Sequence, residues 1–189
     1  MACNATMQKP DFQPTLTGTL VTLKPMHTHD WEGMFKAASN PKTWADHIKN
    51  SRYKEDVFRS FFNDGLSSGS ALSIFDNKTG NIIGSSRYHA YNSDLAEIEI
   101  GWTFIDCAYW GGTYNAQVKR LMLQHAFSFL DIVVFWVATE NLRSQAAMRK
   151  IGGTLREGEF SKTDNGQIYP YVVFEIRKED FLVGPLTAN

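Results

Sequence analysis

The segment FIDCAYWGGTYNAQVKRLMLQHAF (residues 104–127) decides the fold class, because an apolar strand-like run changes into a long amphipathic helix over two glycines and a threonine. The first N–H groups of a helix lack partners within the helix, and together with the helix dipole they bind phosphate well. Glycine lets a phosphate approach the backbone closely and tolerates positive φ. A diphosphate is therefore expected on the amides of Gly111, Gly112, Thr113, Tyr114 and Asn115. The alternative is a tight turn without a ligand, since glycine pairs are common at strand–helix junctions.

The composition limits the classes of function. The chain has 189 residues, which fits one domain, and its formal net charge of −1 gives no basic field for nucleic acid or anionic lipid. No apolar run reaches the length of a bilayer span, and residues 1–15 lack the apolar core of a signal peptide. We therefore expect a cytoplasmic protein whose partners include neither nucleic acid nor membrane. Cys3 and Cys107 show no paired spacing, so no metal site is expected.

The spacing of apolar residues predicts a mixed α/β order of elements. Apolar runs predict strands over 18–26, 71–76, 81–90, 95–105 and 133–139, and a final hairpin that turns at 163–166. Helical spacing predicts helices over 27–39, 53–69, 114–130 and 141–151. No repeat or linker divides the chain. We expect one domain over 15–180, with a flexible N-terminal extension over 1–14 and a C-terminal tail over 181–189.

Two segments together resemble the GNAT acetyltransferase superfamily, in the branch similar to ribosomal-protein N-terminal acetyltransferases. In this family a strand, the motif R/Q-x-x-G-x-G/A and a helix cradle the pyrophosphate of acetyl-CoA. Here the motif reads Trp110-Gly111-Gly112-Thr113-Tyr114-Asn115, and a leading Trp-Gly is frequent in this branch. Thr113 stands at the usual second glycine and Asn115 at the usual small residue. Residues 141–153 resemble the second signature, N-x-x-S/A…K-x-G-F/G.

The resemblance implies a strongly bent mixed β-sheet flanked by helices, in which the strands at 95–105 and 133–139 splay apart as the fourth and fifth strands of the family. Pantetheine would lie in the wedge and pair with the strand backbone near Phe104 and Ile105. Acetyl-CoA would be the co-substrate, without a metal. The implied cofactor-binding residues are Phe104, Ile105, Trp110, Gly111, Gly112, Thr113, Tyr114, Asn115, Asn141 and Ser144.

Two glutamates are candidates for the base that acetyl transfer to an amine needs, because most amines are protonated at neutral pH. Alternation along 95–105 places Glu97, Glu99 and Thr103 on one side of the strand, with Ile100, Trp102 and Phe104 on the other. Glu97 also aligns with the catalytic glutamate of several family members. The alternative is that both carboxylates mark a solvated strand face.

Ser144 is the candidate proton donor. Many family members carry a tyrosine in the helix after the fifth strand, but the aligned residue here is Met148, which cannot donate a proton. Ser144 occupies the alternative site of the ribosomal-protein-like branch, where a hydroxyl near the CoA sulfur can protonate it. Helix capping is the other interpretation of Ser144, and the same holds for Asn141.

The sequence thus predicts an acetyl-CoA-dependent N-acetyltransferase that acts on a primary amine, either a protein N-terminus or a small molecule. An alternative is a non-catalytic acyl-CoA-binding or sensing domain, which the departures at Thr113, Asn115 and Met148 favour. The aromatic residues of 44–62 belong to the region that covers the acceptor groove in this family, although aromatic stripes at helical spacing usually form core. His47 and His89 could each line the acceptor site, although a lone histidine is more often structural. A homodimer is also compatible with the sequence.

Overall fold

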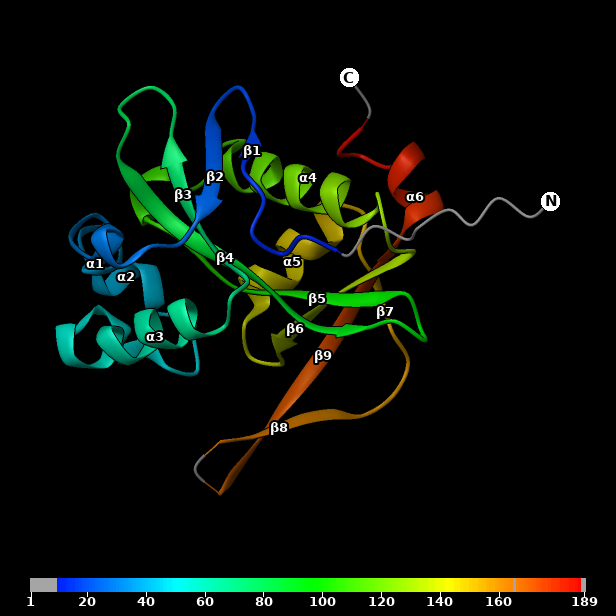
Figure 1. Cartoon of the computed structure of the whole chain (residues 1–189). Helices are drawn as coiled ribbons and strands as arrows, with labels where there is room; N and C mark the ends of the chain where they lie inside the picture. The colour runs from blue at the N-terminus through cyan, green and yellow to red at the C-terminus, as the bar shows by residue number, and fades with distance from the viewer. Residues whose placement is uncertain (1–9, 165, 188–189) are drawn as a thin grey trace.

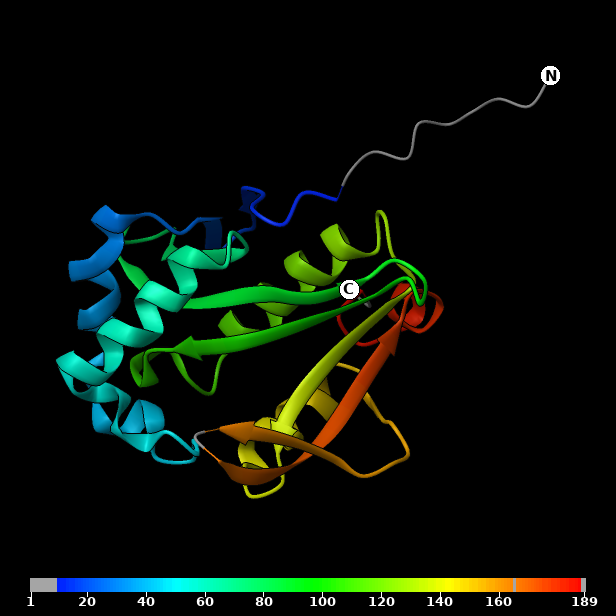
Figure 2. The same cartoon turned by 60° about the horizontal axis from the view of Figure 1, so that its bottom comes forward.

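Strand β5 (Glu97–Ile105), which leads into the glycine turn, lies in the middle of the sheet in the computed structural model, which describes residues 10–164 and 166–187. It pairs antiparallel with β4 (Ile82–Asn92) and parallel with β6 (Ile132–Ala138). Among the described residues the parallel ladder joins 97–99 to 132–134 and then ends. Figure 2 shows the result: β4 and β5 in green diverge from β6 and β9 in yellow and orange. The predicted splaying of these two strands is confirmed.

Nine strands form one sheet within the described residues, in the order β1-β2-β3-β4-β5-β6-β9-β7, with β8 paired to β9 (Figure 1). The other strands are β1 (Leu16–Thr17), β2 (Val21–Pro25), β3 (Ala71–Asp76), β7 (Thr154–Leu155), β8 (Phe160–Asp164) and β9 (Gln167–Arg177). The α-helices are α1 (Trp31–Ala38), α2 (Pro41–Trp44), α3 (Glu55–Ser67), α4 (Tyr114–Ala126), α5 (Leu142–Lys150) and α6 (Lys178–Val183). Short 3-10 turns cover Thr28–Asp30, Asn50–Tyr53 and Cys107–Tyr109. This is the predicted mixed α/β fold.

Two hydrophobic clusters attach the helices to the sheet. The apolar face of α4 packs on β5 and the neighbouring strands. In this face Val118, Met122, Leu123 and Ala126 are completely buried. Beneath α1–α3, an aromatic cluster gathers around the end of β5 and consists largely of Trp44, Phe58, Phe61, Phe62 and Phe104. The aromatic residues of 44–62 therefore serve mainly as core. Strand β5 contributes residues to both clusters, so helices pack on both of its faces.

A bulge in β5 changes which side chains share a face. The β4–β5 register shifts here, and Trp102 has a φ of +49°. An extra residue in one strand of a pair reverses the faces beyond it. As a result Phe104 joins the α1–α3 cluster although Ile100 lies in the α4 cluster, and Thr103 turns toward α4. The prediction that Trp102 and Phe104 face away from Glu99 is wrong, because uninterrupted alternation does not survive the bulge.

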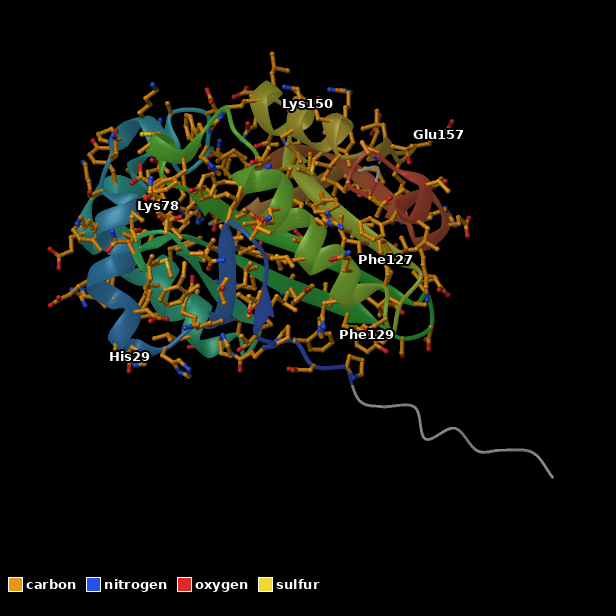
Figure 3. All side chains as sticks on the ribbon, turned by 90° about the horizontal axis from the view of Figure 1, so that it is seen from above. His29, Lys78, Phe127, Phe129, Lys150 and Glu157 are labelled. Carbon is orange, nitrogen blue, oxygen red and sulfur yellow. The ribbon has the colours of Figure 1, made fainter. Side chains whose placement is uncertain are left out.

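The chain ends take part in the core. Phe181 of α6 is only 5% exposed and its ring lies 5.2 Å from that of Phe127, so the helix continues across the predicted boundary at residue 180 and packs on the domain. Phe12, within the predicted extension, contacts Tyr88 and Phe129. Figure 3 labels Phe127 and Phe129 just beyond the end of α4. The rest of that extension, residues 1–9, and residues 188–189 of the predicted tail lie outside the described residues.

Candidate functional site

Two adjoining cavities lie along the wedge between β5 and β6. The turn cavity, of about 550 Å³, is lined by the glycine turn, the end of β5 and α5. The hairpin cavity, of about 400 Å³, is lined by the middle of β5, β6, the 44–52 segment and the β8–β9 hairpin. The residues that line both are His47, Thr103, Asn115, Ser144 and Ala147. The cavities therefore meet, and a group held in one can reach a group held in the other.

The glycine turn forms an open cradle at the far end of the turn cavity. Gly111 has a φ of +78°, a conformation that glycine adopts at little cost, and a Cβ added there would have no neighbour within 4 Å. Gly112 also faces open space. Trp110 fixes the start of the turn, because its indole N–H donates to the Ile105 carbonyl at 2.8 Å. The backbone at the start of α4 is thus accessible to an anion.

Basic side chains surround this cradle. The Arg143 guanidinium lies 3.7 Å above the Trp110 ring centroid and pairs with Asp46 at 2.9 Å. Lys150, labelled at the end of α5 in Figure 3, also lines the turn cavity. Neither residue was among the predicted site residues, although both belong to the second signature segment and their charge suits phosphate. The cradle, the helix N-terminus and two cations fit a phosphorylated ligand.

The structure brings most, but not all, of the predicted cofactor residues to the turn cavity. The predicted cofactor residues that line the turn cavity are Phe104, Ile105, Trp110, Gly111, Gly112, Asn115 and Ser144. Tyr114 points away, because its hydroxyl donates to Asp76 at 3.1 Å, and Thr113 occupies the N-cap position of α4 without lining either cavity. Asn141 lines the hairpin cavity instead.

Asn141 caps helix α5 and thereby places Ser144. Its side-chain oxygen accepts a hydrogen bond from the Ser144 amide at 3.0 Å, and Asn141 is 5% exposed. The cap is therefore made by the asparagine side chain, as its sequence position allowed. Within the described residues the Ser144 hydroxyl forms no hydrogen bond to the protein, and Ser144 lines both cavities. Ser144 is therefore accessible to a ligand at the junction of the cavities.

The two candidate glutamates have different surroundings. Glu99 is 5% exposed, lines the hairpin cavity, and accepts hydrogen bonds from Lys162 Nζ at 3.1 and 3.3 Å. Glu97 lies outside both cavities, and its carboxylate pairs with Arg156 at 2.6 Å, which also binds Glu175 at 2.7 Å. The structure thus brings Glu99 and Ser144 to one cavity, and places Glu97 in an ion-pair network that joins β5 to β9.

The sequence profile of the acetyltransferase (GNAT) domain matches residues 21–154, which is more than half of the chain. The chain belongs to the GNAT acetyltransferase family. No curated protein sequence matches it. Acetyltransferases of this family depend on acyl-CoA.

Solved structures share the GNAT fold at low sequence identity. A probable GNAT acetyltransferase from Chromobacterium violaceum matches with a TM-score of 0.80 and 16% identity over 96% of this chain and 94% of its own. RimJ of Mycobacterium smegmatis in complex with CoA-disulfide matches at 0.70 and 18% over 90% of each chain. Spermidine N-acetyltransferase of Vibrio cholerae, in complex with CoA and spermine, matches at 0.66 and 16% over 87% and 99%. At these identities the likeness shows the fold alone.

Lys119 is a feature of this acetyltransferase domain that sequence reasoning missed. It is 3% exposed on α4, lines the hairpin cavity, and donates to Thr103 Oγ1 at 2.8 Å. Burial lowers the pKa of Lys119 to about 7. The sequence could have indicated this burial, because residue 119 lies at helical spacing from the apolar residues Met122 and Ala126. Its hydrogen bond fixes Thr103 at the junction of the cavities.

His47 also lies at the junction. Burial and, to a lesser extent, the charges of Arg52 and Arg143 together lower the pKa of His47 to about 4, so the ring is neutral at pH 7. Cys107 and His89 line neither cavity; the Cys107 amide donates to Thr43 and the His89 ring packs on Trp102. Among the described residues no group of three His, Cys, Asp or Glu side chains could hold a metal, and no helix is long and apolar enough to cross a membrane.

Proposed function

We propose that this GNAT domain moves the acetyl group of acetyl-CoA directly to a primary amine. The observation that supports this most is the meeting of the two cavities at Thr103, Asn115 and Ser144. Direct transfer requires that two ligands enter separately and that their reacting atoms meet in one place. The anion cradle lies at the far end of the turn cavity, and the buried carboxylate of Glu99 lies in the hairpin cavity.

The turn cavity suits acetyl-CoA. Gly111 and Gly112 leave the backbone open, the N-terminus of α4 supplies unpaired N–H groups, and Arg143 and Lys150 supply charge for phosphates. The unpaired edge of β5 near Phe104 is where the pantetheine arm would lie, since β6 has diverged from it. When bound, acetyl-CoA supplies the acetyl group as a thioester, whose C–S bond breaks as the amine forms the new C–N bond.

Glu99 and Ser144 are the residues that handle protons in this proposal. Glu99 takes one proton from the acceptor ammonium, so that the nitrogen becomes a nucleophile. The Ser144 hydroxyl gives a proton to the departing sulfur and is restored by the second proton that leaves the nitrogen. Glu97 is not assigned a role in the reaction, because its carboxylate is held by Arg156.

The resemblance at the glycine turn decides which acceptors are tested first. The Trp110-Gly111 motif resembles the ribosomal-protein branch, so peptides with an N-terminal Ala or Ser are the first acceptors to try, followed by free amino acids. The competing hypothesis, an acyl-CoA sensor, predicts binding of acetyl-CoA without release of thiol for any amine.

Calorimetric titration with acetyl-CoA tests the cofactor assignment. We expect micromolar binding, and we expect Gly111→Val to raise Kd at least ten-fold, about 1.4 kcal/mol. Gly80→Val is the matched control, because Gly80 has a similar φ of +74° and open surroundings but lies in the β3–β4 turn. Both variants carry the same backbone strain, so only the cavity differs. Equal affinity in folded Gly111→Val and Gly80→Val would overturn the assignment of the turn as the phosphate site.

A further inference from the structure

An ammonium group already sits in an aromatic cage within the hairpin cavity. Lys162 Nζ, from strand β8, lies 4.6 Å from the ring centroid of Trp136, 5.3 Å from that of Trp102 and 5.6 Å from that of Tyr171. On its remaining side it donates to both oxygens of Glu99. Three rings and one buried carboxylate form the usual surroundings of a recognised organic cation.

One residue of this cage has an unfavourable backbone conformation. Trp102 adopts a φ of +49°, which is unfavourable for a residue with a large side chain, and the bulge that contains it turns the ring toward the face of Glu99. Trp136 and Tyr171 come from β6 and β9, two strands that are paired with each other, so their rings have fixed positions. Strained backbone persists where the surrounding structure determines it, and such sites are frequently functional.

Lys162 itself is not fixed in the same way. It lies on the short outer strand β8, which pairs with β9, and its side chain is 36% exposed while that of Glu99 is 6% exposed. A flexible four-carbon stem with access to solvent can leave the cage, whereas the three rings and the carboxylate stay. The cage recognises an alkylammonium group, and a free one has the same chemistry as the end of a lysine.

We propose that this cage is the subsite for the ammonium group of the acceptor, and that Lys162 is a resident occupant that the acceptor displaces. Acetylation of this ammonium rests on the proposed function, but binding of an ammonium by the cage is independent of it. Glu99 then attracts the acceptor nitrogen before it takes its proton. Lys162 competes with the acceptor and lowers its apparent affinity.

The charges around the cage favour a single ammonium over a polyamine. The walls of the hairpin cavity carry four basic side chains, Lys49, Arg52, Lys119 and Lys162, against two carboxylates, Glu99 and Asp164. Asp164 is already paired with Lys49 at 2.8 Å. Beyond Glu99 a second ammonium would therefore meet cations, so the cage is suited to a monoamine such as a peptide N-terminus or an amino compound with one basic nitrogen.

Titration of the full chain without acetyl-CoA tests the cage by itself. The probes are butylammonium, its neutral counterpart 1-butanol, and spermidine, and the readout is the chemical shift of the Trp102 and Trp136 indole N–H resonances. We expect Lys162→Ala to bind butylammonium at least ten-fold more tightly than the unaltered chain, to bind 1-butanol no more tightly, and to prefer butylammonium over spermidine. The gain should disappear in the double variant with Glu99→Gln.

Lys49→Ala is the matched control, because it removes one positive charge from the same cavity and leaves Lys162 in the cage. An equal gain in Lys49→Ala and Lys162→Ala, or an equal gain for 1-butanol, would overturn the proposal. If Lys162→Ala does not fold, Lys162→Ser supplies the same test, with the indole resonances of Trp31 and Trp110 as reporters of folding. Thiol release in the presence of acetyl-CoA is measured separately, so loss of activity and loss of cage binding are distinguishable.

Discussion

Replacement of Lys119 by methionine should stabilise this protein, and the gain should shrink as pH rises. Lys119 lies on the buried face of α4, and its ammonium donates a hydrogen bond to Thr103. Methionine has a similar length and no charge to desolvate. Thr103 keeps a partner in the variant, since the Ser86 hydroxyl lies 2.7 Å from its Oγ1. The substitution thus removes a buried charge and leaves no orphaned hydroxyl.

The size of the effect follows from the two pKa values of Lys119. Burial lowers the pKa from 10.5 in the unfolded chain to about 7 in the folded protein. Between these values the unfolded chain binds more protons, so the stability of the unaltered protein rises with pH. Below pH 7 the penalty is complete, on the order of 5 kcal/mol, and at pH 9 about 2 kcal/mol of it remains. The variant lacks this titration.

Urea unfolding followed by circular dichroism at pH 6, 7, 8 and 9, at constant ionic strength, measures the difference. We expect Lys119→Met to be more stable at every pH, by about 3 kcal/mol more at pH 6 than at pH 9. Lys36→Met, on the exposed face of α1, controls for loss of one positive charge from the whole protein. A stability difference of the same size at all four pH values would refute the reasoning, because it would mean that Lys119 does not lose its proton near neutrality.

Four further substitutions test the site and the fold. Glu99→Gln should lower kcat at least 100-fold with the acetyl-CoA Kd unchanged, whereas Glu97→Gln should leave kcat within about three-fold and lower Tm, because Arg156 loses a partner; equal losses of kcat would remove Glu99 from its role. Ser144→Ala should lower the rate of thiol release about 10- to 100-fold, with Tm unchanged since Asn141 still caps the helix; an unaltered rate would exclude the hydroxyl as the acid. Phe181→Ala should cost about 3–5 kcal/mol in urea unfolding, and a cost below 1 kcal/mol would show that α6 is dispensable.

The spacing of apolar residues predicted the helices and strands that are long enough to repeat that spacing. Strand β3 and the start of helix α4 agree with the predicted 71–76 and 114. Strands β1 and β7 were missed, because two residues carry no period and form only through pairing with β2 and β9. The bulge at Trp102 was also invisible, since positive φ is signalled by glycine or asparagine and seldom by tryptophan. Tertiary packing imposes the positive φ at Trp102.

The site was predictable where backbone chemistry determines it. The open turn at Gly111 follows from the strand–glycine–helix order, and the structure has it. The different surroundings of Glu97 and Glu99 were not predictable, because alternation treats both alike and Arg156, which pairs with Glu97, is 59 positions away from it. The cage around Lys162 was unpredictable for the same reason: its rings come from three strands that only the folded sheet brings together.

The two cavities are built from different parts of the chain. Apart from Thr43 and His47, the walls of the turn cavity come from the single stretch 103–151. The outer wall of the hairpin cavity comes from two distant stretches, 44–52 and 162–171, which the Lys49–Asp164 pair joins. Under the proposed function, the acetyl-CoA site therefore comes mainly from one continuous stretch, and two distant stretches form the outer wall of the acceptor site. Under the same proposal, we expect exchange of these two stretches between relatives to change the acceptor and to leave acetyl-CoA binding intact.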